Sequence, residues 1–343
     1  MPILSFKSKK KRILWAERIK TIDSDLKFAE ALKALFQIQS ASIPPLKLLE
    51  SPVKTGPHHW KQTPALPQRI FKATSLLSAN QISVEFHTSG TTTGSPGIHR
   101  MRDSILYDTA TECGFPWKSN APFTILSLHP DVTEAPHSSL SAMIQHWIKV
   151  YGNSKSHVFF KAGKIESEKL GDSLQIKPTK NQPPFLIIGT AFSFVHLFDA
   201  WGKNRPLKLP KNTVIMETGG YKGRSRELPK KELYRLIEKH FGVEDSQIWN
   251  EYGMTELSSQ AYAQGVDGLH HTPPWTRVVI IDPQTGNEVP IGKTGIIKWY
   301  DLANIDSSGG IQTLDFAIRR RQGFQLLGRA PQTEKRGCSL TLE

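Results

Sequence analysis

The sequence predicts an α/β fold: a largely parallel sheet flanked by helices, followed by a small β-rich C-terminal subdomain. Three observations support this prediction. Short apolar segments typical of buried strands alternate with helix-like segments between residues 123 and 250, which is the pattern of βαβ units. Beyond about residue 265, strand-like segments follow one another with few helical stretches. The chain has 343 residues, 38% of them hydrophobic, which suffices to bury a large core.

The N-terminal part is predicted to form helices and an irregular connection. From about Ile13 to Gln39, apolar residues recur at helical spacing, which indicates one or two amphipathic helices covering the main domain. From Ser42 to Pro67 the chain is rich in proline, lysine and histidine, so we expect an irregular connection. A short strand over Ile82–Phe86 is predicted after it.

The middle of the chain is expected to form the parallel sheet. Five apolar segments have the length of buried strands: Phe123–Leu128, Val158–Phe160, Phe185–Gly189, Thr213–Glu217 and Gln247–Asn250. Three segments of helical character lie between them: Ser138–Tyr151, Ala191–Trp201 and Pro229–Phe241. This alternation is typical of a mostly parallel sheet covered on both faces.

The C-terminal part is expected to be mainly β-structure. Strands and turns are predicted over Trp275–Ile281, Asp282–Asn287, Gly295–Tyr300, Ser307–Gly310 and Phe324–Leu327. The predicted divisions are an N-terminal helical segment (1–40), an α/β core (41–265), a β-rich subdomain (266–327) and a short C-terminal segment (328–343).

Composition argues against several classes of protein. No run of about 18 apolar residues is present, so no membrane span is predicted. The basic patch Lys7–Arg12 is not followed by the apolar segment and cleavage site of a secretory signal. The two cysteines, Cys113 and Cys338, provide no disulfide framework, which favours a cytoplasmic location. Cys113 is expected to be a packing residue.

The formal net charge of +13 raises the question of nucleic-acid binding. The charge is spread along the chain and no RNA- or DNA-binding motif is present, so no nucleic-acid partner is predicted. A positive surface that steers a small anionic ligand or an acidic partner protein, and simple solubility, are the alternative explanations.

A loop rich in glycine and hydroxyl side chains follows the strand over Ile82–Phe86. The residues expected to contact phosphate are Thr88, Ser89, Gly90, Thr91, Thr92, Thr93 and Gly94. Glycine lets backbone N–H groups approach an anion, and the hydroxyls add donors without bulk. No Gly-Lys-Ser/Thr closes the loop as in a Walker-type motif. A flexible surface linker is the alternative.

A second motif, Trp249–Leu257, indicates which kind of phosphate site this is. Its Tyr252–Glu256 core combines an aromatic ring, a glycine, a hydroxyl and a carboxylate. An aromatic ring stacks on a base, Thr255 can bond a phosphate oxygen, and Glu256 is an oxygen ligand suited to Mg²⁺. The alternative is an ordinary loop in which Thr255 caps a helix.

These two motifs, in this order, resemble those of the adenylate-forming superfamily, whose members activate carboxylic acids with ATP to acyl-adenylates and release pyrophosphate. Four further segments resemble the LuxE-like acyl-protein synthetases of bacterial bioluminescence operons and their relatives: Glu217–Gly223, Tyr300–Asn304, Leu327–Arg329 and Arg336–Leu340. The similarity extends from about residue 20 to the C-terminus. It implies the superfamily's N-terminal-type core, ATP and Mg²⁺ as cofactors, and a carboxylic acid, in particular a fatty acid, as substrate.

The resemblance also implies roles for individual residues. The loop over residues 88–97 would hold the β- and γ-phosphates. The other nucleotide-binding residues implied are Gly219, Gly220, Tyr252, Gly253, Thr255, Asp315 and Arg329. Among them, Thr255 would bond the α-phosphate, and Asp315 would hold the ribose hydroxyls. Glu256 would bind Mg²⁺ and, with Thr255, act in catalysis.

The chain departs from the superfamily's pattern at two places. Thr93 is an extra residue in the loop, and the usual lysine after its proline is missing. Arg100 and His99 either replace that charge or begin a solvated helix. Asp315 is followed by Phe316-Ala317 rather than leucine and glycine, so a solvated loop carboxylate is the alternative to a ribose ligand.

The resemblance extends to the end of the chain. Only 14 residues follow Arg329, so the superfamily's C-terminal lid domain, with its catalytic lysine, is expected to be absent or vestigial. A naturally short chain is favoured over a truncated one, because Arg336–Leu340 itself fits the family. The resemblance implies that Cys338 carries the acyl group as a thioester before an acyl reductase receives it. An ordinary small residue in a turn after Gly337 is the alternative.

A group of His129, Asp131, Glu134 and His137 follows the strand predicted over Phe123–Leu128. Its spacing matches no zinc pattern, so no metal site is predicted from it. The resemblance places this region beside the active-site cleft and so implies that it forms a wall for the substrate or the nucleotide.

The sequence therefore predicts an ATP-dependent acyl-protein synthetase that activates a carboxylic acid and transfers it to a protein thiol. A CoA ligase, which shares the adenylation step, is the first alternative. A catalytically weak nucleotide- or protein-binding scaffold is the second.

Overall fold

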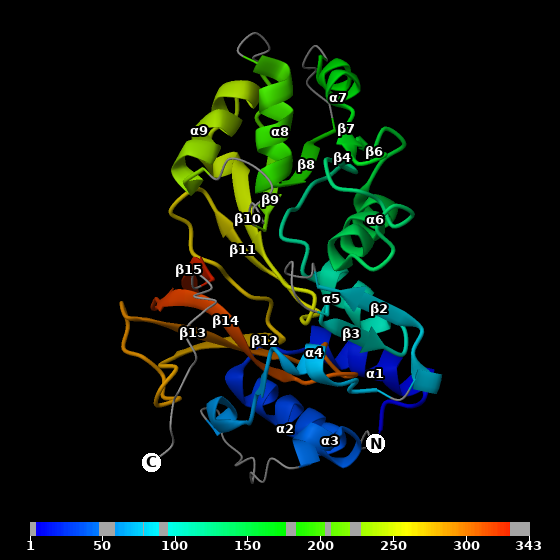
Figure 1. The fold of residues 1–343 in the computed structure, drawn as a ribbon, viewed down its shortest axis with the longest axis vertical. Helices are drawn as coiled ribbons and strands as arrows, with labels where there is room; N and C mark the ends of the chain where they lie inside the picture. The colour runs from blue at the N-terminus through cyan, green and yellow to red at the C-terminus, as the bar shows by residue number, and fades with distance from the viewer. Residues whose placement is uncertain are drawn as a thin grey trace.

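The structure, a computed structural model, describes residues 5–47, 59–77, 79–88, 95–175, 183–202, 207–219 and 228–329. Its α-helices are α1 (Lys9–Lys20), α2 (Asp25–Ser42), α3 (Pro44–Lys47), α4 (Ile70–Ala73), α5 (Ile105–Cys113), α6 (Ser139–Tyr151), α7 (Ser167–Leu174), α8 (Ala191–Trp201) and α9 (Lys230–Phe241). Among these helices, none combines the length and apolar character that crossing a bilayer requires. Two sheets occupy different halves of the molecule, one under α8 and α9 and one above α2 (Figure 1).

The first half is built on a six-stranded sheet in the order β11-β10-β9-β8-β4-β5. Its strands are β4 (Thr124–Ser127), β5 (His157–Val158), β8 (Phe185–Thr190), β9 (Val214–Thr218), β10 (Ile248–Tyr252) and β11 (Ala261–Gln264). All neighbouring strands are parallel except β10 and β11. The mixed α/β architecture predicted from the alternating pattern is confirmed.

Helices cover both faces of this sheet because successive strand residues point to opposite sides. Ile187 and Ile215 pack in one apolar cluster with residues of α7, α8 and α9. Leu186, Ile188 and Met216 pack in another with residues of α5 and α6. These strands are therefore apolar at consecutive positions, as expected of a sheet buried on both faces.

The ends of the flanking helices follow from local chemistry. The Thr190 hydroxyl accepts a hydrogen bond from the Ser193 N–H and so begins α8. Ser138 caps α6 in the same way, through the Ser141 N–H. Helix α9 ends at Gly242, which adopts a left-handed conformation with φ 62°.

The second half contains a five-stranded sheet in the order β1-β14-β13-β12, with β15 also paired to β14. Its strands are β1 (Leu66–Pro67), β12 (Thr276–Ile281), β13 (Thr294–Asp301), β14 (Gly310–Arg319) and β15 (Phe324–Arg329). β1 is parallel to β14, and the other pairs are antiparallel. Sequence reasoning missed β14, which follows directly on the turn predicted over 307–310.

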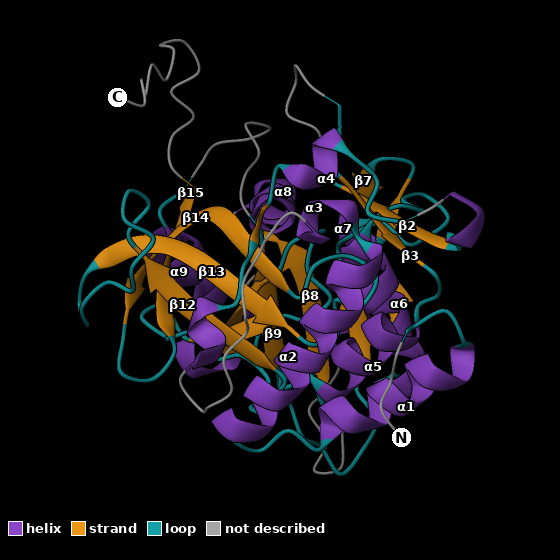
Figure 2. Ribbon diagram, turned by 90° about the horizontal axis from the view of Figure 1, so that it is seen from below, coloured by secondary structure: helices purple, strands orange, loops and turns teal. Residues whose placement is uncertain are grey.

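Helices α1 and α2 cover one face of this second sheet. Seen from below, α1, α2 and α5 lie in front of the strands (Figure 2). Trp15 and Phe28 pack in one cluster with Val279 and Tyr300, and the Trp15 indole donates to the Leu302 carbonyl at 2.7 Å. The predicted N-terminal helical segment thus shares a core with strands of the predicted β-rich subdomain, while the division at residues 40, 265 and 327 stays a prediction.

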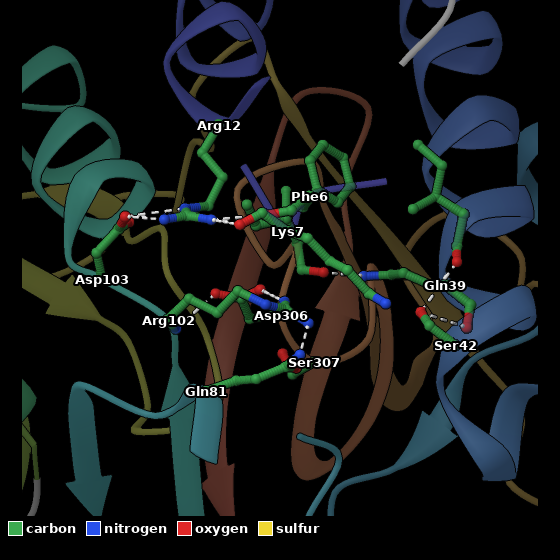
Figure 3. A network of polar contacts seen from close by, with 12 residues as sticks. Phe6, Lys7, Arg12, Gln39, Ser42, Gln81, Arg102, Asp103, Asp306 and Ser307 are labelled. Carbon is green, nitrogen blue, oxygen red and sulfur yellow. Dashed lines mark hydrogen bonds and ion pairs between the residues drawn. The ribbon is translucent and has the colours of Figure 1, made fainter. Parts of the chain in front are cut away.

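A polar network attaches the start of α1 to the rest of the molecule (Figure 3). Buried Arg12 forms an ion pair with Asp103 at 2.6 Å and donates to the Phe6 carbonyl at 2.7 Å. Beside it, Arg102 forms an ion pair with Asp306 and donates to Gln81 at 3.0 Å. These contacts fix the N-terminal helix against the segment that follows β3 (Ile98–Met101).

Candidate functional site

A two-stranded hairpin carries the predicted phosphate loop. β2 (Val84–His87) pairs antiparallel with β3. The Thr88 N–H donates to the Gly97 carbonyl at 2.9 Å, and the Gly97 N–H donates to the Thr88 hydroxyl at 2.8 Å. These two hydrogen bonds close the base of the loop as in a hairpin turn, and Thr88 takes part in both of them.

Several predicted site residues lie outside the described part of the chain. They are Ser89, Gly90, Thr91, Thr92, Thr93, Gly94, Gly220 and Cys338. Gly219 is described: it follows the end of β9 with φ 67°, a conformation that favours glycine. Cys113 is exposed at the end of α5, so the expectation that it packs in the core is wrong.

Arg100 and His99, the two residues considered as replacements for the missing lysine, lie in a strand. Residues 98–101 form strand β3, so the alternative of a solvated helix is wrong. Arg100 pairs across the hairpin with Glu85, with 2.7 Å between Nε and Oε1. His99 is buried, and desolvation lowers its pKa to about 4, so its ring is neutral at pH 7. Arg100 is thus the residue of the two that carries a charge here.

The second motif begins at the end of β10, where Tyr252 faces the five-stranded sheet. Its ring packs against Trp299 and Phe324, with centroids 5.8 and 5.9 Å away. Its hydroxyl donates to Asp315 Oδ2 at 2.9 Å. Tyr252 is only 6% exposed, so little of its surface is left for contact with a base.

Asp315 lies in strand β14 and is buried, not in a solvated loop as one alternative supposed. Its Oδ1 accepts from Arg329 Nε at 3.1 Å, across the pairing of β14 with β15. A carboxylate has about four acceptor positions, so after Tyr252 and Arg329 each oxygen keeps capacity for one further donor. Two ribose hydroxyls match that capacity.

Glu256 has the properties of a buried cation ligand. It is 3% exposed, and its Oε1 accepts from Gln68 Nε2 at 3.0 Å. Burial raises its pKa above the ordinary value, because a neutral amide compensates only part of the lost hydration. A divalent ion beside this oxygen donor would stabilise the charged form, so the residue fits the role expected for Mg²⁺.

Thr255 connects the two motifs. Its hydroxyl approaches the His87 carbonyl at 3.4 Å, and its own carbonyl accepts from His99 Nδ1 at 2.9 Å. His99 Nε2 then accepts from the Ser307 hydroxyl at 3.1 Å. Through these contacts the hairpin that carries the loop is joined to the Tyr252–Glu256 segment.

Two buried carboxyl groups at the ends of β9 and β10 were not singled out as site residues from the sequence. Glu251 accepts a hydrogen bond from the Thr218 hydroxyl, and burial raises its pKa to about 7. Glu217, on the neighbouring strand, accepts from Asn250 Nδ2 at 2.6 Å, and burial also raises its pKa to about 7. Both lie at the carboxyl edge of the parallel sheet, where α/β proteins bind ligands.

Gln68 was missed as well, because it lies just past the stretch predicted to be irregular. Its amide nitrogen donates to Glu256, and its amide oxygen accepts from the Leu314 N–H at 3.3 Å. Gln68 therefore joins the metal-ligand candidate to the strand that carries the ribose-ligand candidate. Gln68 follows β1 directly and lies far in sequence from both Glu256 and β14. The pairing of β1 with β14 brings it to this position.

A known protein family matches most of the chain. The family model described as "Acyl-protein synthetase, LuxE" matches residues 58–343. A long-chain-fatty-acid–luciferin-component ligase of Vibrio harveyi is 23% identical over 141 residues, which cover 38% of this chain and 37% of that protein.

Solved structures share the fold. ATP-bound MatB from Rhodopseudomonas palustris aligns with a TM-score of 0.51 and 16% identity, over 75% of this chain and 50% of that one. A 2-hydroxyisobutyryl-CoA ligase in complex with its acyl-AMP and CoA aligns with a TM-score of 0.58 and 15% identity, over 94% of this chain and 69% of that one. The matches to MatB and to the Vibrio ligase thus span half or less of those proteins.

Proposed function

Because the chain belongs to the acyl-protein synthetase (LuxE) family, we propose that it activates a carboxylic acid with ATP and transfers the acyl group to a protein thiol. The observation that carries this proposal is the convergence of Tyr252, Asp315 and Arg329 with Glu256 beside the hairpin that bears the hydroxyl-rich loop. A fatty acid is the proposed substrate, since the Vibrio relative is a long-chain-fatty-acid ligase.

In the proposed first step, a carboxylate oxygen of the acid attacks the α-phosphorus of ATP. The bond to the bridging oxygen breaks, and pyrophosphate leaves with the electron pair. The protein must orient two anions toward each other and exclude water that would hydrolyse the mixed anhydride. Mg²⁺, when bound, neutralises charge that develops on the phosphate oxygens.

The position of each residue indicates which part of ATP or which ion it would contact. Asp315 would accept the ribose hydroxyls, and the loop that begins at Thr88 would hold the β- and γ-phosphates through backbone N–H groups. Thr255 would donate to the α-phosphate, and Glu256 would hold the metal. Gly219, Gly220 and Gly253 would let the nucleotide approach the backbone closely. Arg100 would be shared between Glu85 and phosphate.

The proposed second step moves the acyl group to Cys338. Its thiolate would attack the acyl carbon, AMP would leave, and a partner acyl reductase would then receive the acyl group. A thiol acceptor needs a reducing compartment, which favours the cytoplasm. The rival acceptor is CoA, favoured by the shared fold with a CoA ligase.

Carboxylate-dependent exchange of labelled pyrophosphate into ATP tests the first step. A panel of fatty, aryl and amino acids should show exchange, strongest with fatty acids. No exchange with any acid would overturn the enzyme proposal and leave a binding scaffold.

Retention of a labelled acyl group on the denatured protein tests the second step. Retention in the native sequence but not in Cys338→Ser supports transfer to this thiol, with Cys113→Ser as the matched control. CoA-dependent turnover without retention would favour the CoA ligase.

A further inference from the structure

Two histidines and a glutamate meet at the base of the hairpin, outside the nucleotide-binding residues described above. Glu85 and His87 alternate along β2 and therefore point to the same side of the strand. His137 comes from the segment before α6 and stacks on His87, with ring centroids 4.0 Å apart. One ligand atom from each of the three residues lies within 4.8 Å of the other two.

The side chains are already held by neighbours that do not use their free ligand atoms. His137 Nδ1 lies 3.2 Å from the Glu85 carbonyl, to which it donates, so Nε2 keeps its lone pair. The His87 N–H donates to the His137 carbonyl at 2.9 Å and ties the two segments together. Arg100 binds Glu85 Oε1, which leaves Oε2 facing His87 Nε2. Metal-binding histidines are commonly oriented by this kind of outer contact.

We propose that Glu85, His87 and His137 form a binding site for a divalent transition-metal ion of the zinc class. Zinc bonds of about 2.1 Å place two tetrahedral ligands about 3.4 Å apart. The distance from His87 Nε2 to Glu85 Oε2 is 3.5 Å. This is long for a hydrogen bond and close to the separation expected between two zinc ligands. Two imidazoles with one carboxylate suit zinc, cobalt or nickel better than Mg²⁺.

Binding requires one local movement. The two imidazole rings are parallel within 5°, so their in-plane lone pairs run side by side and cannot meet at one ion. One ring must turn. The exposed His137 side chain has room to do so; its turn keeps the present distance between His87 and Glu85 and gives up the contact of His137 Nδ1 with the Glu85 carbonyl. Glu85 and His137 also line an open groove on the surface, which gives an ion and its remaining water or anion ligand access.

The location gives the site a consequence for the rest of the protein. A bound ion would link β2 to the segment before α6. The same strand carries the phosphate loop and receives the Thr255 hydroxyl at the His87 carbonyl. Occupancy would therefore restrain the hairpin from which the loop extends.

Direct binding of Co²⁺ and Zn²⁺ to the whole protein, without ATP or acid, tests the proposal. We expect one equivalent of Co²⁺ to give the visible absorption of a low-symmetry site, and Zn²⁺ to displace it. His137→Asn and Glu85→Gln should each weaken binding by more than about tenfold, as expected when a ligand shell is disrupted.

His146→Asn is the matched control, because His146 also lies beside carboxylates, Asp108 and Glu112, but not in this cluster. It should bind Co²⁺ like the unchanged protein. Thermal unfolding without metal identifies a variant that has lost its fold. If either His137→Asn or Glu85→Gln is lost in this way, the binding measured with the other variant tests the proposal. Absence of stoichiometric binding, or equal binding by all variants, would overturn the proposal.

Discussion

Replacing Glu251 by glutamine should change how the stability of this protein depends on pH. Glu251 is buried against Thr218, and the ionisable groups facing it are Glu217 and the tyrosines Tyr107 and Tyr262. None of these supplies a positive charge. Its pKa is therefore raised from 4.5 to about 7 in the folded protein, whereas the unfolded chain has the ordinary value.

The sign and size follow from proton linkage. Between pH 4.5 and 7 the folded protein binds more protons at this site than the unfolded chain, so the free energy of unfolding falls as pH rises. A shift of about 2.5 units at 1.36 kcal/mol per unit amounts to about 3 kcal/mol. This stability is present below about pH 4.5 and is lost as pH rises through 7. Glu251→Gln keeps the shape and cannot ionise.

Urea unfolding followed by tryptophan fluorescence at pH 5 and pH 8 measures the effect. Relative to the unchanged protein, Glu251→Gln should gain about 1–3 kcal/mol in its free energy of unfolding at pH 8, and much less at pH 5. Glu30→Gln, on the exposed side of α2, is the control and should follow the unchanged protein. The reasoning is refuted if Glu251→Gln loses as much stability between the two pH values as the unchanged protein does.

Two further substitutions test other contacts. Tyr252→Phe removes the donor to Asp315 but keeps the ring, so we expect a loss of about 1 kcal/mol in urea unfolding and a higher KM for ATP in pyrophosphate exchange. An unchanged KM would argue against a role of this pair in nucleotide binding. Arg12→Ala leaves Asp103 without its partner, and we expect a loss of about 2–3 kcal/mol because the arginine is buried and the aspartate is partly exposed. A loss below about 0.5 kcal/mol would show that the pair behaves as a surface ion pair.

The sequence predicted the elements whose signals are local. Helix α8, for example, has a threonine cap and an apolar sequence after an apolar strand. Strand β14 was missed because a predicted turn precedes it and its middle carries Asp315, for which a solvated loop was one of the two interpretations. The strand pairing that buries this aspartate is made with β13 and β15, and no local pattern reveals it.

The candidate site was predictable where residues are neighbours in sequence and not where segments meet in space. Tyr252, Thr255 and Glu256 share one motif. Gln68 reaches Glu256 across 188 positions, and His137 meets Glu85 across 52. Periodicity and spacing carry no information about such pairs, because the tertiary fold alone determines which distant segments touch.

The docking of α1 against the far end of the chain has a consequence for synthesis. Trp15 donates to the Leu302 carbonyl, 287 positions later. A ribosome that adds about 5–20 residues per second needs roughly 15–60 s between these two residues. Throughout that interval the apolar side of α1 and α2 lacks the sheet that will cover it. Helices α1 and α2 therefore reach their final packing only late in synthesis, and a nascent chain must keep them from aggregating until β13 and β14 arrive.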